Sequence, residues 1–334
     1  MDQMQMASQF QNAGIEVTSL GLNSKFDVLV ALRLRNLIKK YRPDILHTYL
    51  LHSNLLGRVV GRLAGVPLII SSERTVGLTT GVRKFASKLT NPLTDKVEVN
   101  ATYVGEATVR DLGVPSSKIE VVRSGFDFDL YESTDSREAT RDQLGIKPDE
   151  FMVFSAARFR PSKGVEYVLR TFSKALAQAP NLKLVLAGEG EQDEYLKYLA
   201  SELGITERCN FLGRRTDVPK LLMAADAMLL MSLNEGLPRI ALESMAAGTP
   251  VVATNVGATH EIVEHGETGL LIEPRDIESA TDGLARLSED QELRERISSN
   301  GRRNIMENYS IENYVSRLDS LYKSLMTDQK GSTS

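Results

Sequence analysis

Short apolar stretches alternate with amphipathic stretches along almost the whole chain. The short stretches have the length of a strand and many are rich in β-branched residues, whereas the longer stretches repeat apolar residues three and four positions apart. The first pattern predicts buried strands and the second predicts helices. We expect strands at 15–20, 44–50, 68–73, 96–101, 118–125, 151–157, 182–188, 209–213, 227–232, 250–254 and 269–272, with helices between them, including 27–40, 277–288, 290–307 and 311–326.

This alternation is typical of parallel sheets with helices on both faces. It stops at 129–148, a charged segment without an apolar strand, and then resumes. We therefore predict an α/β protein with two tandem, doubly wound, Rossmann-like domains that face a cleft, because such sheets bind ligands beyond the carboxyl ends of their strands. The predicted parts are a first domain at 1–128, a connection at 129–148, a second domain at 149–308 and a helix at 309–330 that packs back on the first domain.

Composition narrows the class of protein. Of the 334 residues, 42% are hydrophobic and 25% are charged, close to the values of globular proteins. The sequence has no apolar run of membrane-spanning length, no apolar leader in MDQMQMASQFQ, and one cysteine, Cys209. These features predict a cytoplasmic protein without a disulfide framework or a cysteine zinc site.

Charge is unevenly distributed, although the net charge is only −4. Lys and Arg are in excess over residues 1–130, and the remainder carries the negative charge. A mildly basic first half favours an anionic acceptor or a peripheral contact with a membrane surface. Ordinary surface scatter is the simpler alternative, because no long basic block occurs, and we expect no nucleic-acid partner.

The segment 230–243 carries the strongest chemical signal. A buried strand runs into a loop that holds Glu235, and Pro238 suits the first turn of the helix that follows. Glu243 lies early in that helix, near the same end of the sheet, so both carboxylates suit a ligand rich in hydroxyl groups. The alternative is that Glu235 only stabilises the helix dipole and that Glu243 is a solvated helix residue.

This segment resembles family 4 glycosyltransferases, which have the two-domain GT-B fold and transfer sugar from a nucleotide donor with retention at the anomeric carbon. The family signature is Glu, seven residues and Glu, here Glu235 and Glu243. The resemblance implies that Glu235 contacts the donor sugar near the reacting carbon and that Glu243 binds the ribose. It also implies that the backbone amides of Gly236 and Leu237 hold sugar or phosphate.

A second loop, 155–164, bears three cations and ends at a glycine before a helix. It looks like the family's Gly-Arg-Leu…Lys-Gly loop, and Arg158 and Lys163 match the two cations that grip the donor diphosphate. Arg offers a fork of donors and Lys a point charge, and both stabilise a departing nucleoside diphosphate. Ala157 stands where the family usually has Gly, and a solvated basic loop is the alternative.

Weaker matches extend the resemblance over roughly residues 10–325, most densely over 150–275. They place Gly188 and Gly190 in a loop near the nucleotide base. They place Arg214 just before a short helix and Gly257 in a tight turn near the cleft. We expect these four residues to help bind the donor.

Four residues of the first half are candidates for the acceptor side: His47, Glu73, Arg74 and Asn100. Each lies on an expected strand or directly after one, and the family often has a histidine at the cleft where His47 stands. A structural hydrogen bond is the alternative for His47. A solvated ion pair is the alternative for Glu73 and Arg74.

Two departures from the family pattern bear on the first domain. Residues 122–127 read Val-Arg-Ser-Gly-Phe-Asp where the family usually has Pro-Asn-Gly-Val-Asp. The family's opening strand, glycine-rich loop and helix have no counterpart before FQNAGIEVTSLGL. We therefore expect either a fragment or a mis-started gene product, or an incomplete first domain with exposed strand edges and reduced activity.

The resemblance implies a retaining glycosyltransferase that moves a sugar from a UDP- or GDP-sugar to a saccharide or lipid-linked saccharide acceptor, as in the synthesis of cell-surface polysaccharide or glycoconjugates. We expect no metal or other cofactor, because the one Asp-x-Asp, at 127–129, matches an interdomain turn. A degenerate nucleotide-sugar-binding module and a GT-B-type sugar-nucleotide epimerase remain alternatives. The expected location is the cytoplasm or the inner face of the membrane.

Overall fold

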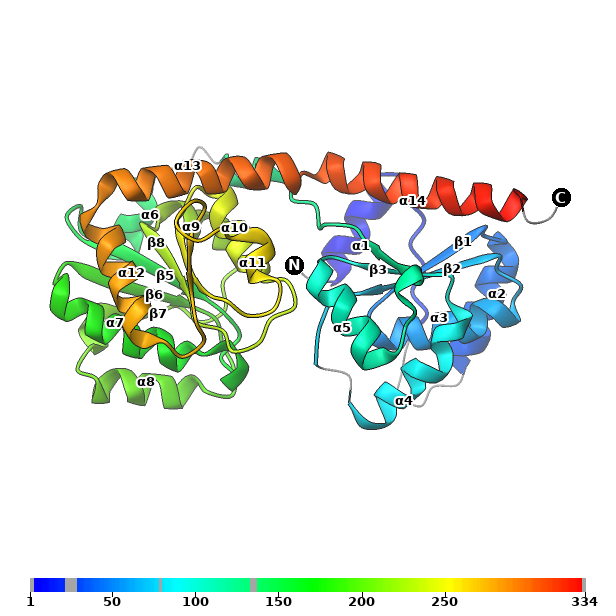
Figure 1. The fold of residues 1–334 in the computed structure, drawn as a ribbon, viewed down its shortest axis with the longest axis horizontal. Helices are drawn as coiled ribbons and strands as arrows, with labels where there is room; N and C mark the ends of the chain where they lie inside the picture. The colour runs from blue at the N-terminus through cyan, green and yellow to red at the C-terminus, as the bar shows by residue number, and fades with distance from the viewer. Residues whose placement is uncertain (1–2, 22–28, 78–79, 133–136, 332–334) are drawn as a thin grey trace.

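A computed structural model describes residues 3–21, 29–77, 80–132 and 137–331, which form two α/β domains side by side (Figure 1). The first domain has a four-stranded sheet in the order β1-β2-β3-β4, and the second has a six-stranded sheet in the order β10-β9-β8-β5-β6-β7. Every pair of neighbouring strands is parallel. The strands are β1 Ile45–Tyr49, β2 Leu68–Glu73, β3 Lys96–Val99, β4 Ile119–Val121, β5 Phe151–Ala156, β6 Leu182–Ala187, β7 Cys209–Phe211, β8 Ala227–Leu230, β9 Val251–Thr254 and β10 Leu270–Ile272.

Helices cover both faces of each sheet, as expected for doubly wound domains (Figure 1). In chain order they are α1 Gln3–Asn12, α2 Leu29–Tyr41, α3 Leu51–Leu63, α4 Gly81–Thr90, α5 Thr102–Leu112, α6 Arg137–Gln143, α7 Val165–Gln178, α8 Asp193–Glu202, α9 Val218–Ala224, α10 Arg239–Ala246, α11 Thr259–Ile262, α12 Ile277–Glu289, α13 Gln291–Asn308 and α14 Ile311–Gly331.

Ten of the eleven expected strands are present, and the strand predicted at 15–20 is wrong. Residues 15–20 join neither sheet, and the side chain of Ile15 is 52% exposed. β-branched residues favour an extended chain, but a strand forms only where a sheet edge supplies backbone partners. Residues 27 and 28 of the expected helix at 27–40 lie outside the described residues, and the rest of it is α2.

The segment 129–148 contains a helix that the sequence pattern did not predict, α6. Its Arg137 and Arg141 form ion pairs of 2.5 and 2.9 Å with Asp226, just before β8. α6 also packs on α9, so it adds to the second domain. Its seven residues are too short to show a clear helical period, which explains why the pattern missed it.

Two chain segments cross between the domains side by side. Phe126 forms a parallel bridge with Ser310, and its amide donates to the carbonyl of Tyr309 at 2.8 Å. After this crossing α14 runs along the first domain, continuing the line of α13 (Figure 1). Its Leu321 and Leu325 pack on Leu68 and Ile70 of β2, so the end of the chain completes the core of the first domain.

Candidate functional site

The loops after β5 and β8 meet at the point where the strand order of the second sheet reverses. β5 has β6 on one side and β8 on the other, so the following loops leave the same edge in opposite directions. This is where doubly wound sheets open a ligand crevice. The amide of Leu233 donates to the carbonyl of Ser162 at 2.9 Å, which ties the two loops together.

The two loops bring Lys163 and Glu235 into direct contact. The Lys163 ammonium donates to Oε1 of Glu235 at 2.6 Å, and the Ser232 hydroxyl donates to the same oxygen at 2.7 Å. Glu235 is only 9% exposed, so the carboxylate is fixed in a partly dry site where its charge acts strongly. The sequence matches had placed these residues in separate loops, and the fold brings them together.

Close backbone contacts hold the Glu235 loop in place. At Gly257, where φ is +61°, an added methyl group would lie 2.2 Å from the carbonyl oxygen of Glu235. The next amide, of Ala258, donates to the carbonyl of Gly236 at 2.8 Å. Only glycine fits Gly257 without moving the loop, which gives the predicted donor residue a structural role beside the site.

The loop that contains Gly188 and Gly190 packs on the loop after β5. An added methyl group at Gly188 would lie 1.8 Å from the carbonyl oxygen of Ala157, and one at Gly190 would lie 2.3 Å from that of Phe159. Both glycines therefore let the two loops touch. Their direct contact with a nucleotide base stays a prediction.

Two predicted donor cations, Arg158 and Arg214, are exposed. Within the described part of the chain, neither guanidinium forms a hydrogen bond or an ion pair. Arg158 follows β5 and is five residues before Lys163, so a free cation stands on the loop that holds the Lys163–Glu235 pair. A free guanidinium on a cleft loop is suited to bind an oxyanion.

Glu243 lies on α10, and among the described residues it forms no ion pair with Lys163. It is 3.8 Å from Arg239, one turn earlier on the same helix. Burial raises the pKa of Glu243, and Arg239 counteracts that shift. Predicted contacts of Glu243 with a ribose and of the Leu237 amide with a phosphate stay predictions, and the Leu237 side chain is part of the core.

On the first domain, a hydrogen-bonded chain runs from α14 to β3. His47 contacts the Tyr322 hydroxyl through Nδ1 at 2.7 Å and the Ser72 hydroxyl through Nε2 at 2.8 Å. Ser72 donates to Glu98 at 2.5 Å, so we assign the Nε2 proton to His47, which donates to Ser72 and accepts from Tyr322. Both ring nitrogens are thus used, as the structural alternative for His47 predicts.

This chain ends at an ion pair between Arg74 and the fully buried Glu98. The Arg74 guanidinium donates to both carboxylate oxygens at 3.0 Å and to the Ser124 hydroxyl at 3.2 Å. Burial raises the pKa of Glu98, and Arg74 opposes that shift. Burial and the nearby Arg74 charge together lower the pKa of His47 to about 4, so the ring is neutral near pH 7.

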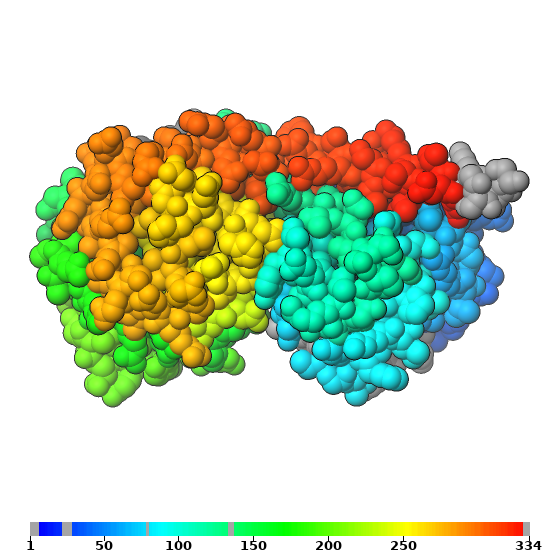
Figure 2. Space-filling view, viewed as in Figure 1, coloured from blue at the N-terminus to red at the C-terminus, as the bar shows by residue number. Residues whose placement is uncertain are grey.

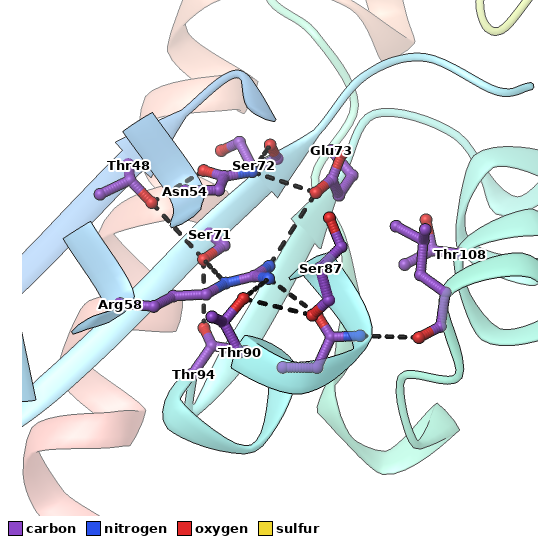
Figure 3. A network of polar contacts seen from close by, with 12 residues as sticks. Thr48, Asn54, Arg58, Ser71, Ser72, Glu73, Ser87, Thr90, Thr94 and Thr108 are labelled. Carbon is purple, nitrogen blue, oxygen red and sulfur yellow. Dashed lines mark hydrogen bonds and ion pairs between the residues drawn. The ribbon is translucent and has the colours of Figure 1, made fainter. Parts of the chain in front are cut away.

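A second network holds Glu73 at the end of β2 (Figure 3). Asn54 donates to Oε1 of Glu73 at 3.0 Å, and Arg58 lies 3.9 Å from the same oxygen. Arg58 is 1% exposed and donates to Ser71 at 2.9 Å and to Asn91 at 2.7 Å. The solvated Glu73–Arg74 pair offered as an alternative is therefore wrong, because each residue has its own buried partner.

Asn100, the last acceptor-side candidate, follows β3 and is 5% exposed. Its Oδ1 atom is buried and finds no hydrogen-bond partner among the residues that the structure describes. A buried acceptor without a partner costs free energy. Asn100 is thus the first-domain candidate with an unused polar atom.

The two domains touch across the cleft. An added methyl group at Gly236 would lie 2.9 Å from the carbonyl oxygen of Arg74. Glu261 of α11 accepts from the amides of Thr102 and Tyr103 at 2.9 and 2.7 Å, and so caps the start of α5. The Glu235 loop therefore faces the end of β2 directly.

Sequence reasoning missed several residues that shape this site: Asn54, Arg58, Ser72, Glu98, Glu261 and Tyr322. One signal was available, because Glu98 is a charged residue in a strand that lies inside the predicted parallel sheet. A buried charge needs a partner, but the sequence does not say that the partner is Arg74. No group of three His, Cys, Asp or Glu side chains in the described ranges is placed to hold a metal ion.

Solved structures with the same architecture are known. Anabaena Alr3699/HepE, solved in complex with UDP, matches 97% of this chain and 89% of its own with a TM-score of 0.83 at 22% identity. Sucrose-phosphate synthase from Thermosynechococcus elongatus covers 94% of this chain and 81% of its own with a TM-score of 0.80 at 22% identity. The protein therefore has the two-domain α/β fold of the GT-B class.

The sequence comparisons give the family. The model described as Glycosyl transferases group 1 matches residues 136–304, and the model described as Glycosyltransferase Family 4 matches residues 5–130. This chain belongs to the group 1 glycosyltransferases, and its resemblance to family 4 is confirmed.

Two curated relatives match most of the chain. The Escherichia coli enzyme UDP-Gal:alpha-D-GlcNAc-diphosphoundecaprenol alpha-1,3-galactosyltransferase is 28% identical over 91% of this chain and 81% of its own. N-acetyl-alpha-D-glucosaminyl L-malate synthase of Bacillus anthracis is 26% identical over the same shares. Among the described helices, none has the length and apolar character needed to cross a membrane.

Proposed function

We propose that this glycosyltransferase moves a sugar from a UDP-sugar, with a GDP-sugar as second choice, to a hydroxyl of a saccharide or lipid-linked saccharide, with retention at the anomeric carbon. The observation that carries the proposal is the Lys163–Glu235 pair, with Arg158 on the same loop as Lys163 and without a hydrogen-bond or ion-pair partner among the residues that the structure describes. Two cations and one oriented carboxylate suit a donor that combines a diphosphate with a sugar.

Each side chain has a distinct part in the proposed reaction. The bond from the anomeric carbon to the diphosphate breaks, and Arg158 and Lys163 stabilise the charge that develops on the leaving group. The acceptor hydroxyl attacks from the same face, and its proton passes to an oxygen of the departing diphosphate. Glu235 orients the sugar near the reacting carbon and keeps Lys163 at the cleft, while Glu243 binds the ribose.

Two similar proteins support this choice of donor and acceptor. Anabaena Alr3699/HepE was solved with UDP, and the Escherichia coli relative is named for UDP-Gal and for an acceptor linked to diphosphoundecaprenol. A role in cell-surface polysaccharide or glycoconjugate synthesis, in the cytoplasm or at the inner membrane face, is consistent with such an acceptor. Asn100, with its unused oxygen, is the first-domain residue that we assign to the acceptor hydroxyls.

Donor turnover tests the proposal. UDP- and GDP-sugars are first screened for a rise in melting temperature, because a bound ligand stabilises the folded state. With the donor so found, Arg158→Ala and Glu235→Ala should each lower kcat by about 100-fold or more, whereas Glu264→Gln, on an exposed turn, should not. Unchanged turnover in both alanine variants would show that the site is assigned wrongly.

Product analysis separates the alternatives. Free nucleoside diphosphate together with a glycosylated product supports transfer. Tight donor binding with no product supports a binding module, and an epimer of the donor supports an epimerase.

A further inference from the structure

Helix α4 turns its large apolar side chains to the solvent, unlike an ordinary surface helix. Val82, Phe85 and Leu89 are 84%, 68% and 68% exposed, and three of the five most exposed large apolar side chains of the described residues lie on these ten residues. With 3.6 residues per turn they form a single outward stripe. A helix normally turns such a stripe to the core.

The inner face of α4 is polar, and the Arg58 network explains why. Ser87 is fully buried, and the Thr90 hydroxyl lies 3.4 Å from the Arg58 guanidinium, so this face packs on polar groups (Figure 3). An apolar side chain placed here would strip Arg58 of a hydrogen-bond partner. The apolar stripe is therefore not a misplaced core face, because the groups on which the inner face of α4 packs are polar.

Basic residues flank the stripe. α4 carries Arg83, Lys84 and Lys88 and no acidic residue. Lys84 pairs with Asp111 of α5 at 3.8 Å, whereas Arg83 and Lys88 are exposed and, within the described ranges, have no ion-pair partner. Apolar side chains bordered by free Lys and Arg are the pattern of a helix that lies in the interface of an anionic membrane.

The position of α4 relates it to the cleft. It lies at the edge of the first domain opposite α14, where the two domains diverge in outline (Figures 1 and 2). A cavity of about 270 Å³ separates α4 from α5 and is lined by Thr75, Val76 and Gly77. Gly77 in turn faces Asn234, the neighbour of Glu235, so a short path joins α4 to the donor loop.

We propose that α4 is a membrane-docking helix that seats its Val82–Phe85–Leu89 stripe among anionic lipids, with Arg83 and Lys88 at the headgroups. The docked helix holds the cleft mouth against the bilayer, where a lipid-linked acceptor presents its sugar. Only this last purpose depends on the proposed function; docking itself requires no transfer. A second copy of the chain fits the stripe less well, because one ten-residue helix offers far less than the roughly 800 Å² per partner of a stable interface, and its basic flanks would repel each other.

Vesicle binding tests the docking helix. The full chain is sedimented with vesicles of phosphatidylcholine alone and of phosphatidylcholine with phosphatidylglycerol, at low and high salt. Binding should need the anionic lipid and weaken with salt. Phe85→Ser combined with Leu89→Ser should lower the partition coefficient by about tenfold or more, and Arg83→Gln combined with Lys88→Gln should lower it on anionic vesicles.

Val82→Ser and Val315→Ser form a matched pair, because both valines are exposed and Val315 lies on α14, at the opposite edge. The first should weaken binding and the second should not. Absence of vesicle binding, or equal binding by the Phe85/Leu89 variant, overturns the proposal, as does a dimer in sedimentation velocity that the same variant abolishes. Transfer to saccharide and to lipid-linked saccharide acceptors is measured alongside: if neither is glycosylated while vesicles still bind, the proposed function fails and the docking helix stands.

Discussion

The two walls of the cleft hold their shape by different means. On the second domain, loops touch through backbone atoms, as at Gly257 and the carbonyl of Glu235. On the first domain, long polar side chains bond to one another, as in Arg58 with Glu73 and Arg74 with Glu98. The difference teaches that one wall depends on the absence of side-chain volume, whereas the other depends on buried ion pairs and on hydrogen bonds between long polar side chains.

Removing a buried cation should have the largest effect, and it tests the first-domain wall. Arg58→Ala removes the ion-pair partner of the buried Glu73 and the donor to Ser71 and Asn91, and should lower the free energy of unfolding by about 3 kcal/mol. Arg110→Ala, on α5, removes a mostly solvated pair with Asp111 and should cost about 1 kcal/mol or less. Urea unfolding measures both; equal losses would contradict a first wall held by buried polar groups.

Added volume should disturb the second-domain wall. Gly257→Ala forces a methyl group against the Glu235 carbonyl and should cost about 2 kcal/mol of stability and raise the KM for the donor. Gly266→Ala is the control, because Gly266 also has a positive φ, of +81°, but open space around it. It should cost about 1 kcal/mol from backbone strain alone and leave KM unchanged. If the two variants behave alike in calorimetry and kinetics, close approach is not what shapes this wall.

A fall in pH should lower the stability of the first domain, because His47 takes up a proton more readily in the unfolded chain. The pKa of His47 is lowered to about 4 in the folded protein, against about 6.5 in an unfolded chain. Between pH 6.5 and 4 the unfolded state binds the extra proton, so stability is lost as pH falls, by about 1 kcal/mol after allowance for solvent. His47→Gln should remove that part of the slope in unfolding experiments run across this range, and His260→Gln, at an exposed position, should retain it.

The smallest effect should come from the contact that joins the walls. Glu261→Gln removes the negative charge at the start of α5 and should cost about 0.5 kcal/mol. Hydrogen exchange at the amides of Thr102 and Tyr103 should quicken about twofold, while Glu264→Gln leaves it unchanged. Unaltered exchange in the Glu261 variant would mean that this carboxylate does not hold the domains together.

Sequence alone predicted the second-domain wall better than the first. Buried parallel strands are continuous apolar runs, so β5 and β8 could be found, and the order of a doubly wound sheet then brings Lys163 and Glu235 together. The strand predicted at 15–20 is wrong because β-branched residues favour an extended chain whether or not a sheet edge is available to pair with it. For His47, the sequence had left a ligand contact and a structural bond open.

The hydrogen-bond networks of the first domain could not be predicted from the sequence, because the residues that they join are distant in sequence. Arg58 bonds to Asn91 across 33 residues, and His47 bonds to Tyr322 across 275. No local spacing encodes such pairs; they exist only after the sheet and α14 have formed.

Because α14 covers β2, the first domain is completed by residues that are synthesised long after its sheet. About 250 residues separate Ile70 from Leu321, which at ordinary elongation rates of about 5–20 residues per second means tens of seconds of synthesis. During that time one apolar flank of the nascent first domain lacks its cover, while the second domain can already fold. The order of the chain thus makes maturation of the first domain wait for α14, and a chain stopped before Leu321 would leave the second domain folded beside an unfinished first domain.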